Sequence, residues 1–147
     1  MPEDPNSFKL PLQWRDLREA SRKVRQQAYA PYSKYQVGAA LLTGDGKIFS
    51  GCNVENASYG LTNCAERTAI FSAIREGNQS FCAVAIVADG HPLPYPCGAC
   101  RQVMHEFCAS DCPIYVAHPD RLDEFQQATL GELLPKAFGS EGGKSRQ

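Results

Sequence analysis

Three cysteines and one glutamate are the residues of this chain best suited to chemistry. Cys64 and Glu66 are separated by a single residue, and Cys97 and Cys100 form a Cys-x-x-Cys segment further along the chain. Three thiolates can hold a zinc ion and leave its fourth position open to water, as in catalytic rather than structural zinc sites. A carboxylate close to the first thiolate can then move the protons of that water. The pattern therefore indicates metal-assisted hydrolysis.

Both cysteine segments are expected to begin helices. The sequence predicts helices over about residues 63–76 and 97–109, the first of them capped by Thr62 or Asn63. The N-terminus of a helix carries partial positive charge and stabilises thiolates. Residues three apart share one helical face, so both thiols of the Cys-x-x-Cys segment can reach the same ion. We therefore expect two helix N-termini to meet at one metal.

Two neighbours of the first cysteine extend this interpretation. Arg67 lies three residues after Cys64, and its guanidinium can offset the net negative charge of three thiolates around Zn²⁺ by donating to a sulfur. The alternative is an exposed surface arginine. Glu66 follows Cys64 too closely to be a second ligand, so we expect it to exchange protons with the metal-bound water. The alternative is a helix-start glutamate that interacts only with the helix dipole.

The Cys-x-x-Cys segment also fits two other kinds of site when it is considered alone. It is compatible with a redox pair or with half of a zinc ribbon. A ribbon requires a second Cys-x-x-Cys segment, and the sequence contains none.

The hydrophobic pattern of the remaining chain predicts an α/β fold. A hairpin is followed by strands that alternate with helices, which favours a three-layer α/β/α sandwich around a mixed five-stranded sheet. The first helix is expected over about residues 13–30. Strands are expected over residues 36–43, 47–53, 81–88, 113–117 and 125–128, and a capping box over residues 129–132 opens a short last helix. We divide the chain into an N-terminal tail (1–11), one domain (12–139) and a flexible C-terminal tail (140–147).

Composition narrows the possible partners and location. The 147 residues are 43% hydrophobic and 21% charged, with a formal net charge of -1 and no basic run, which disfavours a nucleic-acid partner. No apolar stretch has the length of a membrane span, and the start of the chain does not resemble a secretory signal. Seven cysteines, an odd number, suit metal ligands and buried thiols in a reducing compartment better than disulfides. We expect a cytoplasmic protein with no membrane partner.

The two cysteine segments together resemble the zinc-binding motifs of cytidine deaminases, in particular the short type whose ligands are all cysteines. The resemblance extends to residues 29–42, 51–59 and 133–135, and it covers the chain from residue 12 to residue 139. It implies hydrolytic deamination of cytidine and 2′-deoxycytidine to uridine and 2′-deoxyuridine with release of ammonia, a reaction of pyrimidine salvage. It also implies one zinc ion per subunit.

The resemblance assigns roles to individual residues. The three cysteines match the zinc ligands and Glu66 matches the proton shuttle. Asn53 and Glu55 match positions that hold the ribose hydroxyls, and Ala65 matches one that offers backbone hydrogen bonds to the pyrimidine. Tyr35 falls where the family commonly has phenylalanine against the base. The additional hydroxyl of this tyrosine requires a polar partner or water.

The resemblance also implies an assembly. Family members of this length form homotetramers in which active sites are shared between subunits. Tyr59 and Phe138 match positions near the subunit contacts.

Three alternative functions share some of these features. A deaminase for another aminopyrimidine nucleoside, such as blasticidin S, has the same zinc motifs, although the run from Asn53 to Asn56 favours cytidine. A polynucleotide-editing deaminase is disfavoured by the charge balance. A zinc module that only binds nucleosides or partners is disfavoured by Glu66, because a purely structural zinc needs no carboxylate beside an open position.

Overall fold

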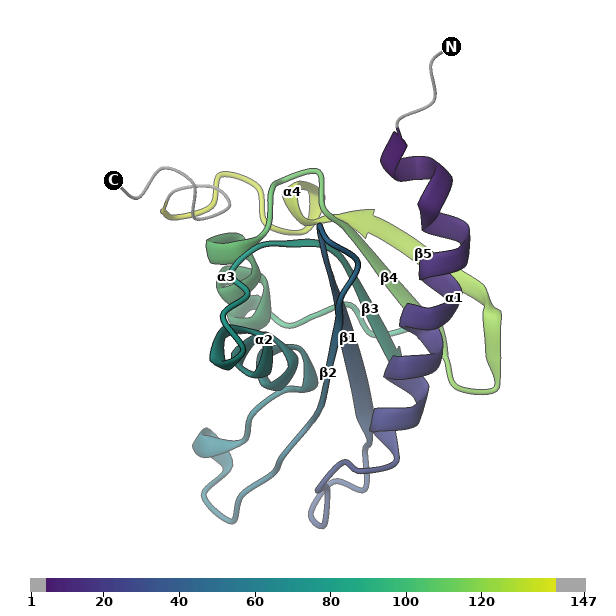
Figure 1. Ribbon diagram of the computed structural model, residues 1–147. Coiled ribbons are helices and arrows are strands. Elements are labelled where there is room, and N and C mark those ends of the chain that lie inside the picture. The colour runs from purple at the N-terminus through teal and green to yellow at the C-terminus, as the bar shows by residue number, and fades with distance from the viewer. Residues whose placement is uncertain (1–4, 140–147) are drawn as a thin grey trace.

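The computed structural model of this protein describes residues 5–139, with side-chain environments from residue 13 onward. The expected C-terminal tail of residues 140–147 lies outside the described residues. The strands form one sheet in the order β2-β1-β3-β4-β5 (Figure 1). Only the β3–β4 pair is parallel, so the expected mixed five-stranded sheet is confirmed. The strands are β1 (Val37–Thr43), β2 (Ile48–Cys52), β3 (Phe81–Ala88), β4 (Pro113–His118) and β5 (Arg121–Thr129).

Helices cover both faces of this sheet and complete the expected three layers (Figure 1). One face is covered by α1 (Pro5–Arg25), and the other by α2 (Ala65–Arg75) and α3 (Gly98–Phe107). The chain also contains a short 3₁₀ helix, η1 (Tyr59–Leu61), and a last single turn, α4 (Leu130–Leu133). The parallel strands β3 and β4 are joined through α3, as parallel neighbours require a crossover connection.

Alternation along β1 creates the two halves of the core. Ala39 and Leu41 pack with residues of α2 and α3, whereas Ala40 and Leu42 pack against Trp14 and its neighbours in α1. Successive residues of a strand point to opposite faces, so a central strand between two helical layers must be apolar on both sides. This is why β3 is a nearly continuous apolar run, with every residue buried except one.

The first helix differs from its prediction at both ends. It begins at Pro5, so residues 5–11 of the expected N-terminal tail are helical. Proline fits a first helical position because its missing N–H would have no partner there. The helix ends at Arg25 rather than near residue 30. The reason is that the Tyr29 N–H donates to the Asn53 carbonyl at 3.0 Å, which draws the chain into an extended pairing.

Two further boundaries were predicted wrongly. The N-cap of α2 is Cys64, because the backbone of Asn63 exchanges two 2.9 Å hydrogen bonds with Val54 and stays extended. The last strand begins at Arg121, four residues before its predicted start. It is an edge strand with mostly exposed residues, so its first half carries no apolar signal. The capping box of Thr129 and Glu132 is present as predicted.

The packing of α2 on β2 leaves no room for a side chain at Gly51. A Cβ atom there would lie 2.4 Å from the Ala69 backbone nitrogen and 2.8 Å from the Thr68 carbonyl carbon. Because backbone atoms must move, we expect Gly51→Ala to lower the free energy of unfolding by about 1–3 kcal/mol or more, measured by urea denaturation. The matched control is Gly44→Ala, where a Cβ meets nothing within 4 Å. Equal stability of the two variants would contradict this close packing.

Candidate metal centre and active site

The three cysteine sulfurs converge where two helices begin. Cys64 is the N-cap of α2, Cys97 is the N-cap of α3, and Cys100 lies in the first turn of α3. The sulfurs all lie within 4.8 Å of one another, and the Cys64 and Cys97 Sγ atoms are 3.9 Å apart. Cys100 is fully buried, whereas Cys97 is exposed. The two helix N-termini thus present three sulfurs to one point, with access from solvent on one side.

This donor set fits zinc with one position left open. A tetrahedral ion with Zn–S bonds of about 2.3 Å separates its sulfurs by about 3.8 Å, close to the distance between the first two cysteines. Within residues 13–139, no fourth cysteine, histidine or carboxylate joins the group. Three soft protein ligands and a free coordination position are typical of catalytic zinc sites.

Hydrogen bonds distribute charge among these thiols. The pKa of Cys64 is lowered to about 5, chiefly because the Cys100 thiol hydrogen-bonds to its sulfur, with a further contribution from Arg67. The Arg67 Nη2 atom donates to Cys64 Sγ at 3.2 Å. The pKa of Cys100 is raised by the same thiol hydrogen bond and by burial. Metal ligation requires thiolates, so zinc binding releases the proton that Cys100 holds.

Removal of the arginine that contacts Cys64 is expected to weaken metal binding. Arg67→Ala should lower zinc affinity by about 10–100-fold, the range for groups that hydrogen-bond to metal ligands, in a competition titration against a chelator. Arg75→Ala is a suitable control, because Arg75 is exposed on the same helix and pairs with Glu76 at 2.8 Å. An unchanged affinity in Arg67→Ala would show that Arg67 does not support the sulfur.

Glu66 is buried beside the cysteines, with 5% of its surface exposed. Its pKa is raised to about 7, mainly by burial, against the opposing effect of its own backbone N–H. A carboxyl group with a pKa in this range can both accept and release a proton near neutral pH. Ala65 precedes it as the first helical residue and is fully buried. The N–H groups of a first helical turn lack intrahelical acceptors and are available to a ligand.

Asn53 and Glu55 hold the segment before β1 in place. Asn53 is buried; its Oδ1 accepts from the Val37 N–H at 2.9 Å, and its Nδ2 donates to the Tyr35 carbonyl at 2.7 Å. The Glu55 carboxylate accepts from the Ser33 hydroxyl and from backbone N–H groups of residues 32 and 33 at 3.0 and 3.1 Å. The Ser33 hydroxyl is also the main cause that lowers the pKa of Glu55. The ribose roles of these two residues stay a prediction.

Tyr35 finds the polar partner that its hydroxyl requires. The hydroxyl donates to the Asp89 carbonyl at 2.6 Å, and the residue remains 38% exposed. Burial is the main cause that raises the pKa of Tyr35, followed by the charge of Asp89, and the charge of Glu66 also contributes. The structure thus ties Tyr35 to the residue that directly follows β3.

The two residues predicted at subunit contacts are exposed in the single chain. Tyr59 and Phe138 are 75% and 85% exposed. The Tyr59 ring makes an edge contact with Tyr32 at 5.9 Å between centroids, and the Phe138 carbonyl accepts from the Gln102 amide at 3.0 Å. Their role in an interface stays a prediction.

Arg101 was missed by the sequence analysis. Its Nε donates to the Pro96 carbonyl at 2.6 Å and its Nη1 to the Leu133 carbonyl at 2.8 Å. Arg101 thereby ties the residue before Cys97 to the end of α4. No sequence signal reveals this contact, because both acceptors are backbone carbonyls and one is distant in the chain.

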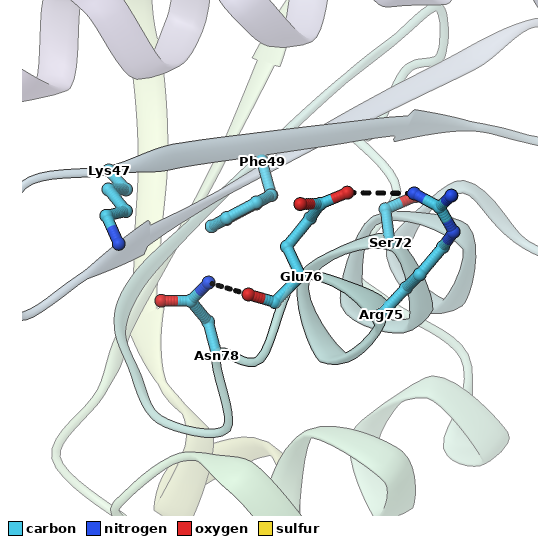
Figure 2. A pocket seen from close by; sticks show the side chains of 6 residues that line it. All are labelled: Lys47, Phe49, Ser72, Arg75, Glu76 and Asn78. Atoms are coloured by element: carbon cyan, nitrogen blue, oxygen red, sulfur yellow. Dashed lines mark hydrogen bonds and ion pairs between the residues drawn. The ribbon is translucent and has the colours of Figure 1, made fainter.

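An open pocket of about 640 Å³ lies at the opposite end of α2, between that helix end and the β1–β2 hairpin (Figure 2). The two basic side chains that line this pocket already form ion pairs. Lys47 Nζ lies 3.4 Å from Asp45 Oδ2, and Arg75 Nη1 lies 2.8 Å from Glu76 Oε1. This pocket contains none of the residues of the metal centre. Its lining residues are Lys47, Phe49, Ser72, Arg75, Glu76 and Asn78.

The family model for the cytidine and deoxycytidylate deaminase zinc-binding region matches residues 13–116. The chain belongs to this family. The predicted resemblance is therefore confirmed. A cytidine deaminase of Sporosarcina psychrophila is 52% identical over 121 residues, which is 82% of this chain and 88% of the relative. A cytidine deaminase of Halalkalibacterium halodurans is 54% identical over 120 residues, which is 81% of this chain and 89% of the relative.

Solved structures of the family share the fold. The crystal structure of cytidine deaminase from Burkholderia pseudomallei superposes with a TM-score of 0.79 at 50% identity, covering 84% of this chain and 98% of that one. The enzyme from Mycobacterium tuberculosis gives a TM-score of 0.72 at 42% identity, covering 86% of this chain and 97% of that one. The expected deaminase-like sandwich is confirmed.

Proposed function

We propose that this protein catalyses the hydrolytic deamination of cytidine and 2′-deoxycytidine to uridine and 2′-deoxyuridine, with release of ammonia. The observation that carries the proposal is the buried Glu66 carboxyl beside three sulfurs that lie within 4.8 Å of one another. Relatives named cytidine deaminase, more than half identical over most of the chain, support it. The expected place of the reaction is pyrimidine salvage.

One zinc ion per chain would be held by Cys64, Cys97 and Cys100. When bound, zinc acts as a Lewis acid that lowers the pKa of water and so supplies the nucleophile near neutral pH. Arg67 offsets the negative charge of the thiolates through its hydrogen bond to Cys64 Sγ. The N-termini of α2 and α3 add partial positive charge at the same point.

Glu66 moves the protons of the reaction. Its carboxylate accepts a proton from the attacking water and delivers it to N3 of the pyrimidine, which makes C4 more electrophilic. The oxygen then bonds to C4 and gives a tetrahedral intermediate. Glu66 then takes the remaining proton from the oxygen on C4 and delivers it to the amino nitrogen. The C4–N bond breaks as the C4 carbonyl forms, and ammonia leaves. The burial of Glu66 restricts proton exchange with bulk water.

Four residues position the substrate in this proposal. Asn53 and Glu55 hold the ribose hydroxyls, and each keeps capacity beyond its present contacts: a second amide hydrogen and additional carboxylate lone pairs. The Ala65 backbone binds the pyrimidine, and the Tyr35 ring lies against it. The contacts of Asn53 with residues 35 and 37 link the sugar and base regions of the site.

We propose that the protein works as a cytoplasmic homotetramer whose active sites are shared between subunits, with Tyr59 and Phe138 at the contacts. The exposure of both rings supports the interface. An odd number of cysteines, three of them in the sulfur cluster, suits a reducing compartment. No helix within residues 5–139 is long and apolar enough to cross a membrane. The net charge of -1 supports a nucleoside rather than a nucleic-acid partner.

The deciding experiment follows ammonia and uridine together after the purified, zinc-loaded protein is mixed with cytidine. We expect both products to appear in equal amounts. Parallel assays use 2′-deoxycytidine, deoxycytidine monophosphate, blasticidin S and cytidine within single-stranded RNA or DNA. If the protein acted only on deoxycytidine monophosphate, only on blasticidin S or only on the polynucleotide, that compound would be its substrate in place of cytidine. No product with any of them from a folded, zinc-replete sample would contradict the proposed function.

A further inference from the structure

Asp89 joins three separate parts of the chain directly after β3. Its backbone carbonyl accepts from the Tyr35 hydroxyl at 2.6 Å. Its carboxylate accepts from Arg25 Nη2 at 2.8 Å and lies 3.0 Å from His118 Nε2. Arg25 is the last residue of α1, and His118 is the last residue of β4. The position of the Asp89 carbonyl is therefore set from two elements besides its own strand.

The donor of this hydrogen bond is also tied to its neighbours. Arg25 reaches the Gln36 carbonyl with its Nε at 2.9 Å while its Nη2 contacts Asp89. The carbonyl of Tyr35 itself accepts from Asn53 Nδ2 at 2.7 Å. The Arg25 guanidinium thus binds both the carbonyl of Gln36, which follows Tyr35, and the carboxylate of Asp89, the residue that Tyr35 contacts. Charge-assisted hydrogen bonds are shorter and stronger than neutral ones, and the Arg25 side chain is mostly buried, although the Asp89 carboxylate is 56% exposed.

This contact borders the proposed substrate site. Tyr35 precedes β1, and its carbonyl accepts from the amide of Asn53 at 2.7 Å, so the ring belongs to the segment that contacts a proposed ribose-binding residue. Asp89 opens the segment that leads to the metal-ligating Cys97. The hydroxyl donates its proton to a carbonyl, so Tyr35 has no free proton to give to a substrate. The group is suited to orienting the ring and not to acid catalysis.

We propose that Tyr35 and Asp89 form a positioning pair, in which the Asp89 carbonyl, set by Arg25 and His118, orients the Tyr35 ring against the pyrimidine. The inference rests on the proposed function. The inference depends on the tyrosine at position 35, because a phenylalanine, common at this position in the family, has no hydroxyl to donate to the Asp89 carbonyl. The ring makes the same contact in ground state and transition state, so its loss raises KM more than it lowers kcat.

The test compares steady-state kinetics of the zinc-loaded wild type with Tyr35→Phe, Asp89→Asn and the double variant. Tyr35→Phe removes one hydroxyl and should raise KM for cytidine and the inhibition constant of uridine by about 3–10-fold, with kcat changed less than twofold. Asp89→Asn should raise both constants by about 2–5-fold. The double variant should be no worse than Tyr35→Phe, because Asp89 acts through that hydroxyl.

The matched control is Asp123→Asn. It removes another carboxylate that pairs with an arginine of α1, since Asp123 lies 2.8 Å from Arg18, and it should leave both constants unchanged. Zinc content is measured for each variant. An unchanged KM in Tyr35→Phe would overturn the inference, and so would additive effects in the double variant. Tyr35→Phe alone decides the matter if Asp89→Asn does not fold.

Failure of the proposed function gives a different result. A wild type that does not deaminate cytidine contradicts the function, and calorimetric binding of uridine to the wild type and Tyr35→Phe then tests the positioning pair directly. A threefold or larger loss of uridine affinity supports it, and equal affinity overturns it. A wild type that neither turns over cytidine nor binds uridine overturns both.

Discussion

Replacement of Glu66 by glutamine is expected to lower kcat for cytidine deamination by about 10²–10⁴-fold while zinc stays bound. Glutamine has nearly the size of glutamate, but its amide neither accepts the proton of the attacking water nor returns it to the ring. Glu66 is buried, so bulk water has little access to the site and cannot easily take over the proton transfer. Uridine and ammonia are measured together, and zinc is quantified in the same samples.

The stability of this variant distinguishes a lost proton shuttle from a damaged fold. An ionised carboxylate in a buried position costs desolvation energy, and a neutral amide avoids most of that cost. We therefore expect the Tm of Glu66→Gln to equal or exceed that of the wild type. Glu76→Gln, at the exposed end of α2, serves as the control and should keep full activity. Turnover near the wild-type level in Glu66→Gln would contradict the proposed mechanism.

Replacement of Cys100 by serine is expected to abolish stoichiometric zinc binding and activity together. Cys100 is the buried member of the sulfur cluster, so no solvent molecule can easily take its place. A serine hydroxyl stays protonated and binds zinc poorly compared with a thiolate. We expect zinc affinity to fall by more than about 100-fold, beyond the effect of removing a group that only supports a ligand. Chelator competition measures it.

Metal loss should also reduce the thermal stability gained from zinc. Zinc that binds the folded chain more tightly than the unfolded chain raises the Tm, so Cys100→Ser should lose most of the Tm increase that zinc gives the wild type. Cys82→Ser is the control, because this exposed thiol of β3 lies outside the cluster. If Cys100→Ser retained zinc at wild-type affinity, Cys100 would not be a ligand.

The gathering of these side chains was predictable because its signals are local. Cys97 and Cys100 lie three residues apart at the start of a helix, so helical periodicity alone brings them to one face. Glu66 and Arg67 follow Cys64 within one helical turn. Their residue types indicate that the arginine donates hydrogen bonds and that the glutamate accepts protons. The central strand β3 was also predictable from a local signal. A strand buried on both faces must be apolar throughout, and such a run is visible in the sequence.

The tertiary structure decided what depends on distant backbone atoms. The end of α1, the N-cap of α2 and the start of β5 follow from pairings with remote segments or from an exposed sheet edge, which leave no pattern in the local sequence. Arg101, Arg25 and Tyr35 each contact backbone carbonyls, and a carbonyl is the same in every residue. Side-chain types and short spacings therefore predicted which side chains gather at this site, whereas only the fold determined how they are held.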